Sequence, residues 1–310
     1  MSFLSRLFGP PDVDELRDKG DVEALIKALW YEKSAAVRRD AAGALGDTGD
    51  QRAVGPLTDT LDDAESAVRQ AAIEALANLA DPQALEPLAG ALKHRDAAIR
   101  HEAVTLLGDL RGPRVVELLC QAIDDEEREV RVTAAQLLGE LAKADAVPTL
   151  VEALGDRYWR VREAAAKALR EIGDPATVPA LTKALGDSSS DVRGNAARAL
   201  GELGPAAVPA LVEVLRDGRT DDLRKGAAQA LGKIGDNAAI PALIEALGDS
   251  AQIVRMWAAE ALGKIGGPPA SALIQALSNR NTDVRQSAAR ALKLIGWEPS
   301  RDEAGASYWI

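Results

Sequence analysis

The chain has 310 residues, of which 47% are hydrophobic and only 3% aromatic, and its formal net charge is -11. A strongly acidic chain disfavours nucleic acid as a partner, because binding to phosphates depends on clustered lysine and arginine. No apolar run has the length that a membrane-spanning helix needs, and the apolar stretch in the opening MSFLSRLFGPP is too short for a secretory signal. We therefore expect a cytoplasmic protein.

Residues 1–19 are predicted to form an N-terminal cap. Phe3, Leu4, Leu7 and Phe8 are apolar and precede an acidic, helix-like stretch, DVDELRDK. A stack of repeats leaves its first hydrophobic face uncovered, and such a segment can cover it. The alternative is a short anchor for a partner or a membrane surface, because Arg6 interrupts an amphipathic pattern.

An internal repeat occupies residues 20–297. Its marker is an apolar residue followed by arginine and then by alanines. The arginines are Arg38, Arg69, Arg100, Arg131, Arg162, Arg193, Arg224, Arg255 and Arg285, so the spacing is 31 residues seven times and then 30. Such a period is typical of a repeat array rather than of separate domains, and we expect one array of nine units.

Each repeat contains two helical patterns, which are clearest in the fifth copy. Residues 146–154 place apolar side chains at the spacing of an amphipathic helix, with Pro148 in the first turn. Residues 158–172 form a second such pattern, and Gly173 provides the left-handed residue that ends a helix. Gly49 and Gly235 recur at the same place. The prediction is an all-α fold, an α-solenoid of stacked helix pairs.

The fifth copy, DRYWRVREAAAKALREIGD from Asp156 to Asp174, resembles the short HEAT-like repeat named after the phycobilin lyases. The resemblance covers nearly the whole chain and implies an α-solenoid whose second helices line the concave side. Proteins with similar repeats include lyase subunits, a hypusine-pathway hydroxylase, DNA-repair glycosylases and binding scaffolds. The fold alone therefore does not select a function.

Alignment of the copies separates framework positions from variable ones. We number each position from the repeat's arginine, so that row −6 lies six residues before it. Row −6 is mostly acidic: Glu32, Asp63, His94, Asp125, Asp156, Asp187, Gly218, Asp249 and Asn279. An acidic row beside an arginine row predicts a structural ladder in which each carboxylate holds a turn and pairs with a guanidinium.

Two rows on the second helix vary from copy to copy. Row +2 is Asp40, Ala71, Glu102, Thr133, Ala164, Asn195, Gly226, Trp257 and Ser287, and row +5 is Gly43, Glu74, Thr105, Gln136, Lys167, Arg198, Gln229, Glu260 and Arg290. A packed core does not accept Gly and Trp, or Gly and Arg, at equivalent places. We therefore expect both rows to face solvent. Because the resemblance implies that second helices line the concave side, these rows would form the floor of a groove.

Two tryptophans are candidate anchors for a partner in that groove. Trp159, beside Tyr158 and Arg160, lies three residues before its repeat arginine, and Trp257 lies in row +2. Exposed tryptophans often dominate binding energy at interfaces. The competing interpretation is that both rings lie flat on a neighbouring repeat.

Row +9 changes sign along the array. It begins with acidic or neutral residues and ends with Lys233 and Lys264. Ion pairs within one helix, Lys167 with Glu171, Arg198 with Glu202 and Glu260 with Lys264, are expected to neutralise part of it. Any remaining polarity would suit an extended peptide or protein of opposite charge order.

Catalytic and metal-binding patterns are scarce. The resemblance to the hydroxylase implies several His-Glu pairs, but the sequence has one, His101-Glu102, and its other histidine, His94, lies in row −6. One pair does not assemble a two-metal site. The single cysteine, Cys120, lies on an apolar helical face and is expected to be buried and inert. We assign no catalytic residue, no metal and no cofactor.

Residues 298–310 are predicted to be a C-terminal cap or tail, with Tyr308, Trp309 and Ile310 at the end. The sequence as a whole favours a non-enzymatic scaffold that binds a protein or peptide along its second helices. A bilin lyase or lyase-like chaperone acting on a client protein is the alternative. The expected contact residues are Glu102, Thr133, Gln136, Trp159, Arg160, Lys167, Asn195, Arg198, Gln229, Trp257, Glu260 and Arg290.

Overall fold

A computed structural model describes residues 10–79, 85–266 and 269–297, and throughout these ranges the chain is helical with no strand. The α-helices form two compact units, residues 1–141 (unit 1) and 142–310 (unit 2). Unit 1 contains α1 (Val13–Asp18), α2 (Val22–Ala28), α3 (Ala35–Thr48), α4 (Val54–Thr60), α5 (Ser66–Asn78), α6 (Leu85–Ala91), α7 (Ala97–Leu107), α8 (Pro113–Ala122) and α9 (Arg128–Leu141). Unit 2 contains α10 (Val147–Ala153), α11 (Trp159–Ile172), α12 (Val178–Ala184), α13 (Ser190–Leu203), α14 (Val208–Asp217), α15 (Asp221–Ile234), α16 (Ile240–Ala246), α17 (Gln252–Ile265), α18 (Ala270–Ala276) and α19 (Thr282–Leu294).

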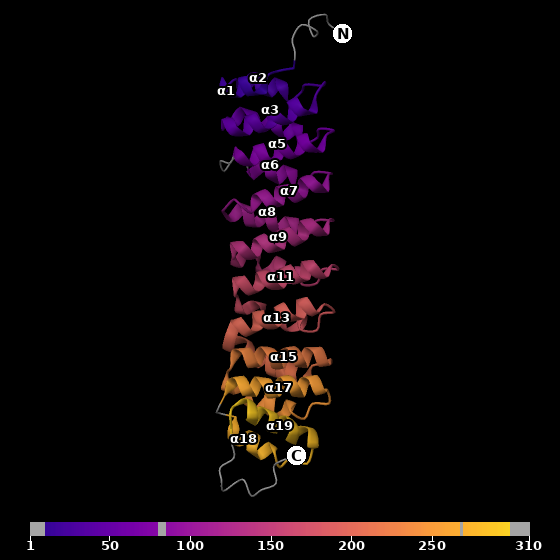
Figure 1. The fold of residues 1–310 in the computed structure, drawn as a ribbon, viewed down its shortest axis with the longest axis vertical. Helices are drawn as coiled ribbons and strands as arrows, with labels where there is room; N and C mark the ends of the chain where they lie inside the picture. Colours follow the sequence, from indigo (N-terminus) through magenta and orange to yellow (C-terminus); the bar gives the residue numbers. More distant parts are fainter. Residues whose placement is uncertain (1–9, 80–84, 267–268, 298–310) are drawn as a thin grey trace, which may run out of the picture. The chain divides into compact units, whose positions relative to one another are not determined.

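Within each unit the helices are paired as the repeat predicts, and the pairs are stacked. The second helix of each pair is odd-numbered from α3 onward, and successive second helices pack side by side within a unit, as Figure 1 shows for α3, α5, α7 and α9 and separately for α11, α13, α15 and α17. The all-α solenoid architecture predicted from the repeat is therefore confirmed.

Glycine ends several second helices in the left-handed conformation. Gly49, Gly173 and Gly235 have φ values of 66°, 69° and 73° and lie directly after α3, α11 and α15. The aspartate that follows each glycine is the N-cap of a short 3-10 helix, and its side chain accepts a hydrogen bond from the backbone N–H two residues later. These helices are η2 (Gln51–Ala53), η5 (Pro175–Thr177) and η7 (Asn237–Ala239). Two further 3-10 helices are η4 (Ala144–Ala146) and η6 (Gly204–Ala207). The predicted Gly-Asp punctuation is confirmed.

Glycines in row +8 allow successive second helices to approach closely. A Cβ on Gly46 of α3 would lie 2.8 Å from the Cα of Ala75 in α5, and a Cβ on Gly232 of α15 would lie 2.7 Å from the Cα of Ala261 in α17. Carbon atoms in van der Waals contact are about 3.5–4.0 Å apart, so no side chain fits at these positions. Small residues therefore set the spacing of the stack.

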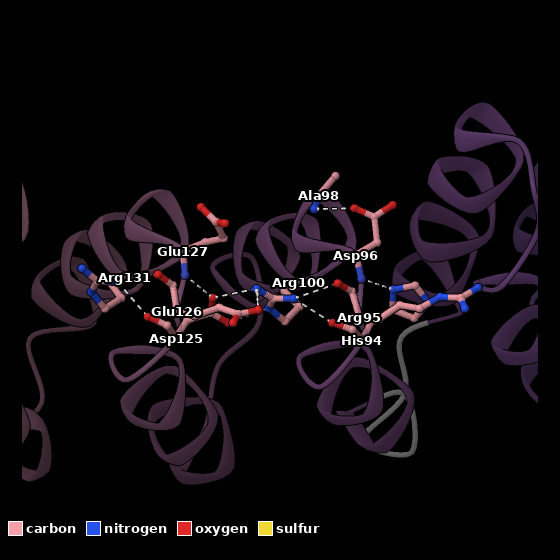
Figure 2. Close-up of polar contacts among 9 residues, drawn as sticks. All are labelled: His94, Arg95, Asp96, Ala98, Arg100, Asp125, Glu126, Glu127 and Arg131. Carbon is pink, nitrogen blue, oxygen red and sulfur yellow. Dashed lines mark hydrogen bonds and ion pairs between the residues drawn. The ribbon is translucent and has the colours of Figure 1, made fainter.

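The predicted ladder is present and links neighbouring repeats (Figure 2). Four row arginines each hold the aspartate of the following repeat with two hydrogen bonds, Nε to Oδ2 at 2.6–2.7 Å and Nη2 to Oδ1 at 2.7–3.0 Å: Arg38–Asp63, Arg100–Asp125, Arg162–Asp187 and Arg224–Asp249. Each aspartate also accepts the N–H two residues later in its own turn, as Asp125 does from Glu127 at 2.8 Å. The arginines and row −6 are thus framework.

Other acids substitute where row −6 lacks aspartate. His94 Nδ1 accepts a hydrogen bond from the N–H of Asp96 at 3.0 Å. Asp96 then replaces the missing aspartate as partner of the preceding row arginine, since its Oδ2 accepts a hydrogen bond from Arg69 Nη2 at 2.6 Å. Where row −6 is Gly218, Asp222 Oδ1 lies 3.7 Å from Nε of the preceding Arg193. Where row −6 is Asn279, Asp283 Oδ1 lies 3.5 Å from Nη2 of the preceding Arg255. His94 is therefore a structural substitute for aspartate.

Two local features differ from expectation. Cys120 is half-buried at the edge of the apolar face of α8, so the prediction of a buried thiol is wrong. Ala142, eleven residues after Arg131, occupies the place of the capping glycine and has a φ of 47°, which costs an L-residue about 1–2 kcal/mol.

Several sequence predictions concern parts that the structure does not describe. Phe3, Leu4, Leu7, Phe8, Tyr308, Trp309 and Ile310 lie outside the described residues. The caps at 1–19 and 298–310 and the single array at 20–297 stay predictions. Among the described residues, no helix is both long and apolar enough to cross a membrane.

Candidate functional site

Rows +5 and +9 lie on the solvent side of the second helices. In row +5, Glu74, Thr105, Gln136, Lys167, Arg198 and Arg290 are exposed and Gln229 and Glu260 are half-buried. In row +9, every residue from Asp47 to Lys264 is exposed. The prediction that row +5 faces solvent is confirmed for its exposed members and holds only in part at half-buried Gln229 and Glu260, and row +9 provides a second exposed line beside it.

Row +2 does not face solvent throughout, and the prediction is wrong for three of its members. Asn195 is only 4% exposed, and its side-chain amide donates to Asp191 O within α13 at 2.9 Å. Ala164 and Gly226 are also buried, and a Cβ on Gly226 would lie 3.0 Å from Leu185 of the preceding repeat. The physical reason is that this row lies at the seam with a neighbouring first helix. Asn195 is thus removed from the candidate surface.

Glu102 and Thr133, in row +2 of unit 1, are half-buried. His101 lies beside them, and its Nε2 is 3.0 Å from Thr133 Oγ1 of the next repeat. His101 is thus tied into a contact between repeats. In the described part of the chain, no three His, Cys, Asp or Glu side chains are grouped so that they could hold a metal ion.

Trp159 begins α11 and belongs to a small aromatic and cationic cluster. Its ring centroid lies 6.3 Å from that of Tyr158 with the planes tilted by 51°, and the Arg160 guanidinium carbon lies 5.4 Å from the Trp159 centroid. Such a distance allows a cation–π interaction. Trp159 is half-buried and Arg160 is exposed, so the tryptophan is not the fully exposed anchor that the sequence suggested.

Trp257, on α17, is also half-buried and carries a cation over its ring, with Lys264 Nζ 5.9 Å from the centroid. Lys264 Nζ also lies 3.6 Å from Glu260 Oε1, which confirms one predicted ion pair within a helix. Trp257, Glu260 and Lys264 therefore form one surface group on α17.

The other two predicted pairs are wrong. Lys167 Nζ lies 2.7 Å from Glu163 Oε1, one turn before it, rather than beside Glu171. Glu202 pairs across repeats, with Lys233 Nζ at 2.8 Å and Arg170 Nε at 3.7 Å. Stacking brings row +9 of α13 and α15 together, and this proximity between repeats is not visible in the sequence of one helix.

A groove of about 460 Å³ lies over these helices in unit 2. Its lining consists of Ala197, Arg198, Gln229, Gly232, Lys233 and Lys264, which come from α13, α15 and α17. Three of the six are cations and none is acidic. We call this set the basic groove. Lys233 and Lys264 were absent from the contact residues expected from the sequence, although the sign change of row +9 pointed to them.

Unit 1 has a hollow of different character between α1 and α3. It has a volume of about 630 Å³, and its lining includes Asp12, Asp14, Asp40 and Asp47 together with Arg17 and Arg39. Both arginines are already paired, Arg17 with Asp14 at 3.0 Å and Arg39 with Asp40 at 2.7 Å. This hollow therefore offers mainly negative charge.

Trp30, two residues after the end of α2, is an exposed tryptophan that the sequence reasoning missed. It is 54% exposed, more than half of a large apolar side chain. Its position immediately after the apolar run ALIKAL concealed it, since that run predicts burial.

Comparison with known proteins identifies a family and several solved structures of related fold. No curated protein is similar to the chain. The solved structure of an engineered protein is 25% identical, covering 89% of this chain and 88% of its own, with a TM-score of 0.44. Human deoxyhypusine hydroxylase in complex with glycerol is 26% identical, covering 82% of this chain and 99% of its own, with a TM-score of 0.37. The complex of CpcE and CpcF of phycocyanin lyase from Nostoc sp. PCC7120 is 25% identical, covering 78% of this chain and 93% of its own, with a TM-score of 0.41.

The family is fixed by the repeats themselves. The profile of HEAT repeats matches six overlapping segments, residues 12–77, 55–129, 116–201, 150–231, 179–263 and 208–293. Together these segments span the helix pairs of both units. The chain is therefore a HEAT-repeat protein and belongs to the HEAT-repeat family.

Proposed function

We propose that this HEAT-repeat scaffold is non-enzymatic and binds a protein or peptide on rows +5 and +9 of its second helices. The observation that carries the proposal is the contrast between rows on the same helices. The row arginines and row −6 are used by the ladder in repeat after repeat, whereas row +5 is largely exposed and changes its chemistry from Glu74 to Gln136 to Arg198. Exposed side chains that vary within a rigid repeat are what a scaffold can adapt to a partner.

Row +5 supports binding more than the rest of the surface because its side chains are long and hydrogen-bonding. Gln136, Lys167, Arg198 and Gln229 each offer donors at successive second helices. Polar groups presented by rigid helices bind with less loss of conformational freedom than groups on loops. Row +2 contributes at its half-buried members, Glu102, Thr133 and Trp257, and the exposed Arg160 lies beside Trp159.

Photo-crosslinking tests which layer of the stack contacts a partner. A photoreactive amino acid is placed at exposed Gln136 or Lys167 on second helices, and as a matched control at exposed Glu117 or Lys183 on first helices. The protein is irradiated in the lysate of the cell that makes it. We expect adducts of defined mass from Gln136 and Lys167 and none from Glu117 and Lys183. Adducts only from the first helices would contradict the proposal.

The bilin-lyase alternative makes a separate prediction. A lyase would hold a tetrapyrrole and form a thioether bond between it and a client protein. The purified protein would then show visible absorption, and incubation with bilin and client would give a coloured client after denaturation. The scaffold proposal predicts neither signal. The expected cytoplasmic location is a further prediction, which cell fractionation tests.

A further inference from the structure

The basic groove of unit 2 stands out because its charge opposes that of the chain. The chain carries 48 acidic residues against 37 lysines and arginines, yet the groove lining contains three cations and no acid. Its floor is made of small residues, buried Ala197 and Gly232. Gly232 is required there because Ala261 of α17 lies so close to it. The floor is thus set by helix packing and not by the cations.

The cations retain hydrogen-bonding capacity toward a ligand. Arg198 is exposed, and its side chain makes no hydrogen bond or ion pair with any residue in the described ranges, so its guanidinium offers all its donors. Lys233 Nζ donates to Glu202 Oε1 at 2.8 Å and to Arg198 O at 3.4 Å, which holds the ammonium against α13 and leaves one of its three donors. Lys264 Nζ lies 5.9 Å from the Trp257 ring centroid and 3.6 Å from Glu260 Oε1, an exposed and loose ion pair that a ligand carboxylate can replace.

The spacing of the helices determines which ligand fits. Adjacent packed helices lie about 8–10 Å apart, and the three cations come from three successive second helices. An extended peptide in the polyproline II conformation advances about 3.1 Å per residue with three residues per turn, so side chains three residues apart point the same way and lie about one helix step apart. We propose that the basic groove binds an extended acidic peptide segment of a partner protein, with carboxylates about three residues apart. This inference rests on the proposed function and names the chemistry of its partner.

A peptide fits better than a nucleic acid on two observations. The cations are not continued along the stack, since the row +9 residue on α11, before the groove, is Glu171, which would repel a longer phosphate backbone. Gln229 in the lining presents both a donor and an acceptor, which suits the amide groups of a peptide backbone. An acidic peptide needs only a short cationic stretch with hydrogen-bonding groups between the charges.

Fluorescence anisotropy with defined probes tests the assignment. The main probe is a labelled peptide of about nine residues, long enough at about 3.1 Å per residue to cross two helix steps, with glutamate at every third position and Gly or Ser elsewhere. Comparison probes have the same glutamates side by side, lysine in place of glutamate, or a thymidine oligonucleotide of equal length. We expect wild-type protein to bind the spaced acidic peptide most tightly and to lose affinity as salt is raised.

The groove variant carries Arg198→Gln, Lys233→Gln and Lys264→Gln. Since an exposed ion pair contributes a factor of about two to five in affinity, the three changes should weaken the spaced peptide about tenfold or more. The matched control removes three exposed cations of unit 2 outside the groove, Lys183→Gln, Arg219→Gln and Arg280→Gln, and should bind within about twofold of wild type. Thermal unfolding of both variants confirms that each is folded.

Three results would overturn the inference: no binding of the spaced peptide at low salt, equal binding by the groove variant, or tighter binding of the oligonucleotide than of the peptide. These failures are distinguishable from failure of the proposed function. If crosslinks still form at Gln136 and Lys167, the scaffold function stands and only the acidic chemistry of the partner is wrong.

Discussion

Adding one methyl group to α3 should have opposite effects at two glycines that are three residues apart. Gly43 lies in exposed row +5 and has no atom within 4 Å of a Cβ placed on it, whereas Gly46 lies in row +8 against α5. Both substitutions to alanine gain the same helix propensity, about 1 kcal/mol. Gly43→Ala should therefore stabilise the protein by about 1 kcal/mol.

Gly46→Ala adds a steric cost to that gain. The new Cβ would lie 2.8 Å from Ala75 Cα and 2.9 Å from Ala75 Cβ, about 1 Å inside van der Waals contact, and the first of these atoms is backbone. Overpacking of this kind costs about 1–3 kcal/mol. Because the propensity gains cancel, the two variants should differ in free energy of unfolding by about 1–3 kcal/mol, with Gly46→Ala the less stable.

The assay is urea unfolding followed by circular dichroism, with hydrogen exchange of residues 35–48 to localise the effect. Gly232→Ala in α15, where the Cβ would lie 2.7 Å from Ala261 Cα, repeats the test in unit 2. Equal stability of Gly43→Ala and Gly46→Ala would refute the division of the second helix into a packing row and a free surface row. The proposed function depends on the same division.

Three further predictions concern the framework. Asp63→Asn leaves Arg38 with one acceptor at residue 63 besides Tyr31 O and removes the opposite charge, and should cost about 1–3 kcal/mol in urea unfolding at neutral pH. Asp40→Asn at the exposed Arg39 pair should cost less than about 0.5 kcal/mol. The hydrogen bond from Arg38 holds the pKa of Asp63 below its usual value. The stability that this pair contributes is therefore fully present above the unfolded pKa of about 4 and is lost as pH falls through the folded pKa. The difference in free energy of unfolding between wild type and Asp63→Asn should shrink on acidification to about pH 3, and a constant difference would contradict the pair. Ala142→Gly should stabilise by about 0.5–1 kcal/mol because it relieves a positive φ, and Gly173→Ala should destabilise by about 1 kcal/mol; the same sign for both in thermal or urea unfolding would contradict the capping argument.

The framework was predictable from sequence because the same residue types recur at the same positions from repeat to repeat. Arg162 and Asp187 are matched by equivalents in other copies, so position alone identified the ladder, and Gly173 with Asp174 marked the helix end. The exception at His94 follows the same chemistry, since its Nδ1 accepts the turn N–H that an aspartate carboxylate accepts in other repeats. What the sequence did not show was which repeat supplies the partner: each arginine holds the aspartate of the following repeat.

The candidate surface was less predictable because its variation has two physical causes. Row +5 varies because it is largely exposed, but row +2 also varies where a member is fitted to a neighbouring repeat, as Gly226 is to Leu185. Variation alone does not separate the two. The basic groove depends on Lys233 reaching the preceding repeat, where Glu202 and Arg198 O hold it, and only the stacking of α13 and α15 reveals that contact.

Partner capture by wild type and two matched variants tests the central claim most directly. One variant changes exposed row +5 residues outside the basic groove to alanine, Glu74, Gln136 and Lys167, and the other changes exposed first-helix residues, Glu117, Glu152 and Lys183. Both should fold with the stability of wild type. We predict that the protein captured by wild type is lost with the row +5 variant and retained with the first-helix variant. Retention by the row +5 variant together with loss by the first-helix variant would place binding on the other layer and contradict the account.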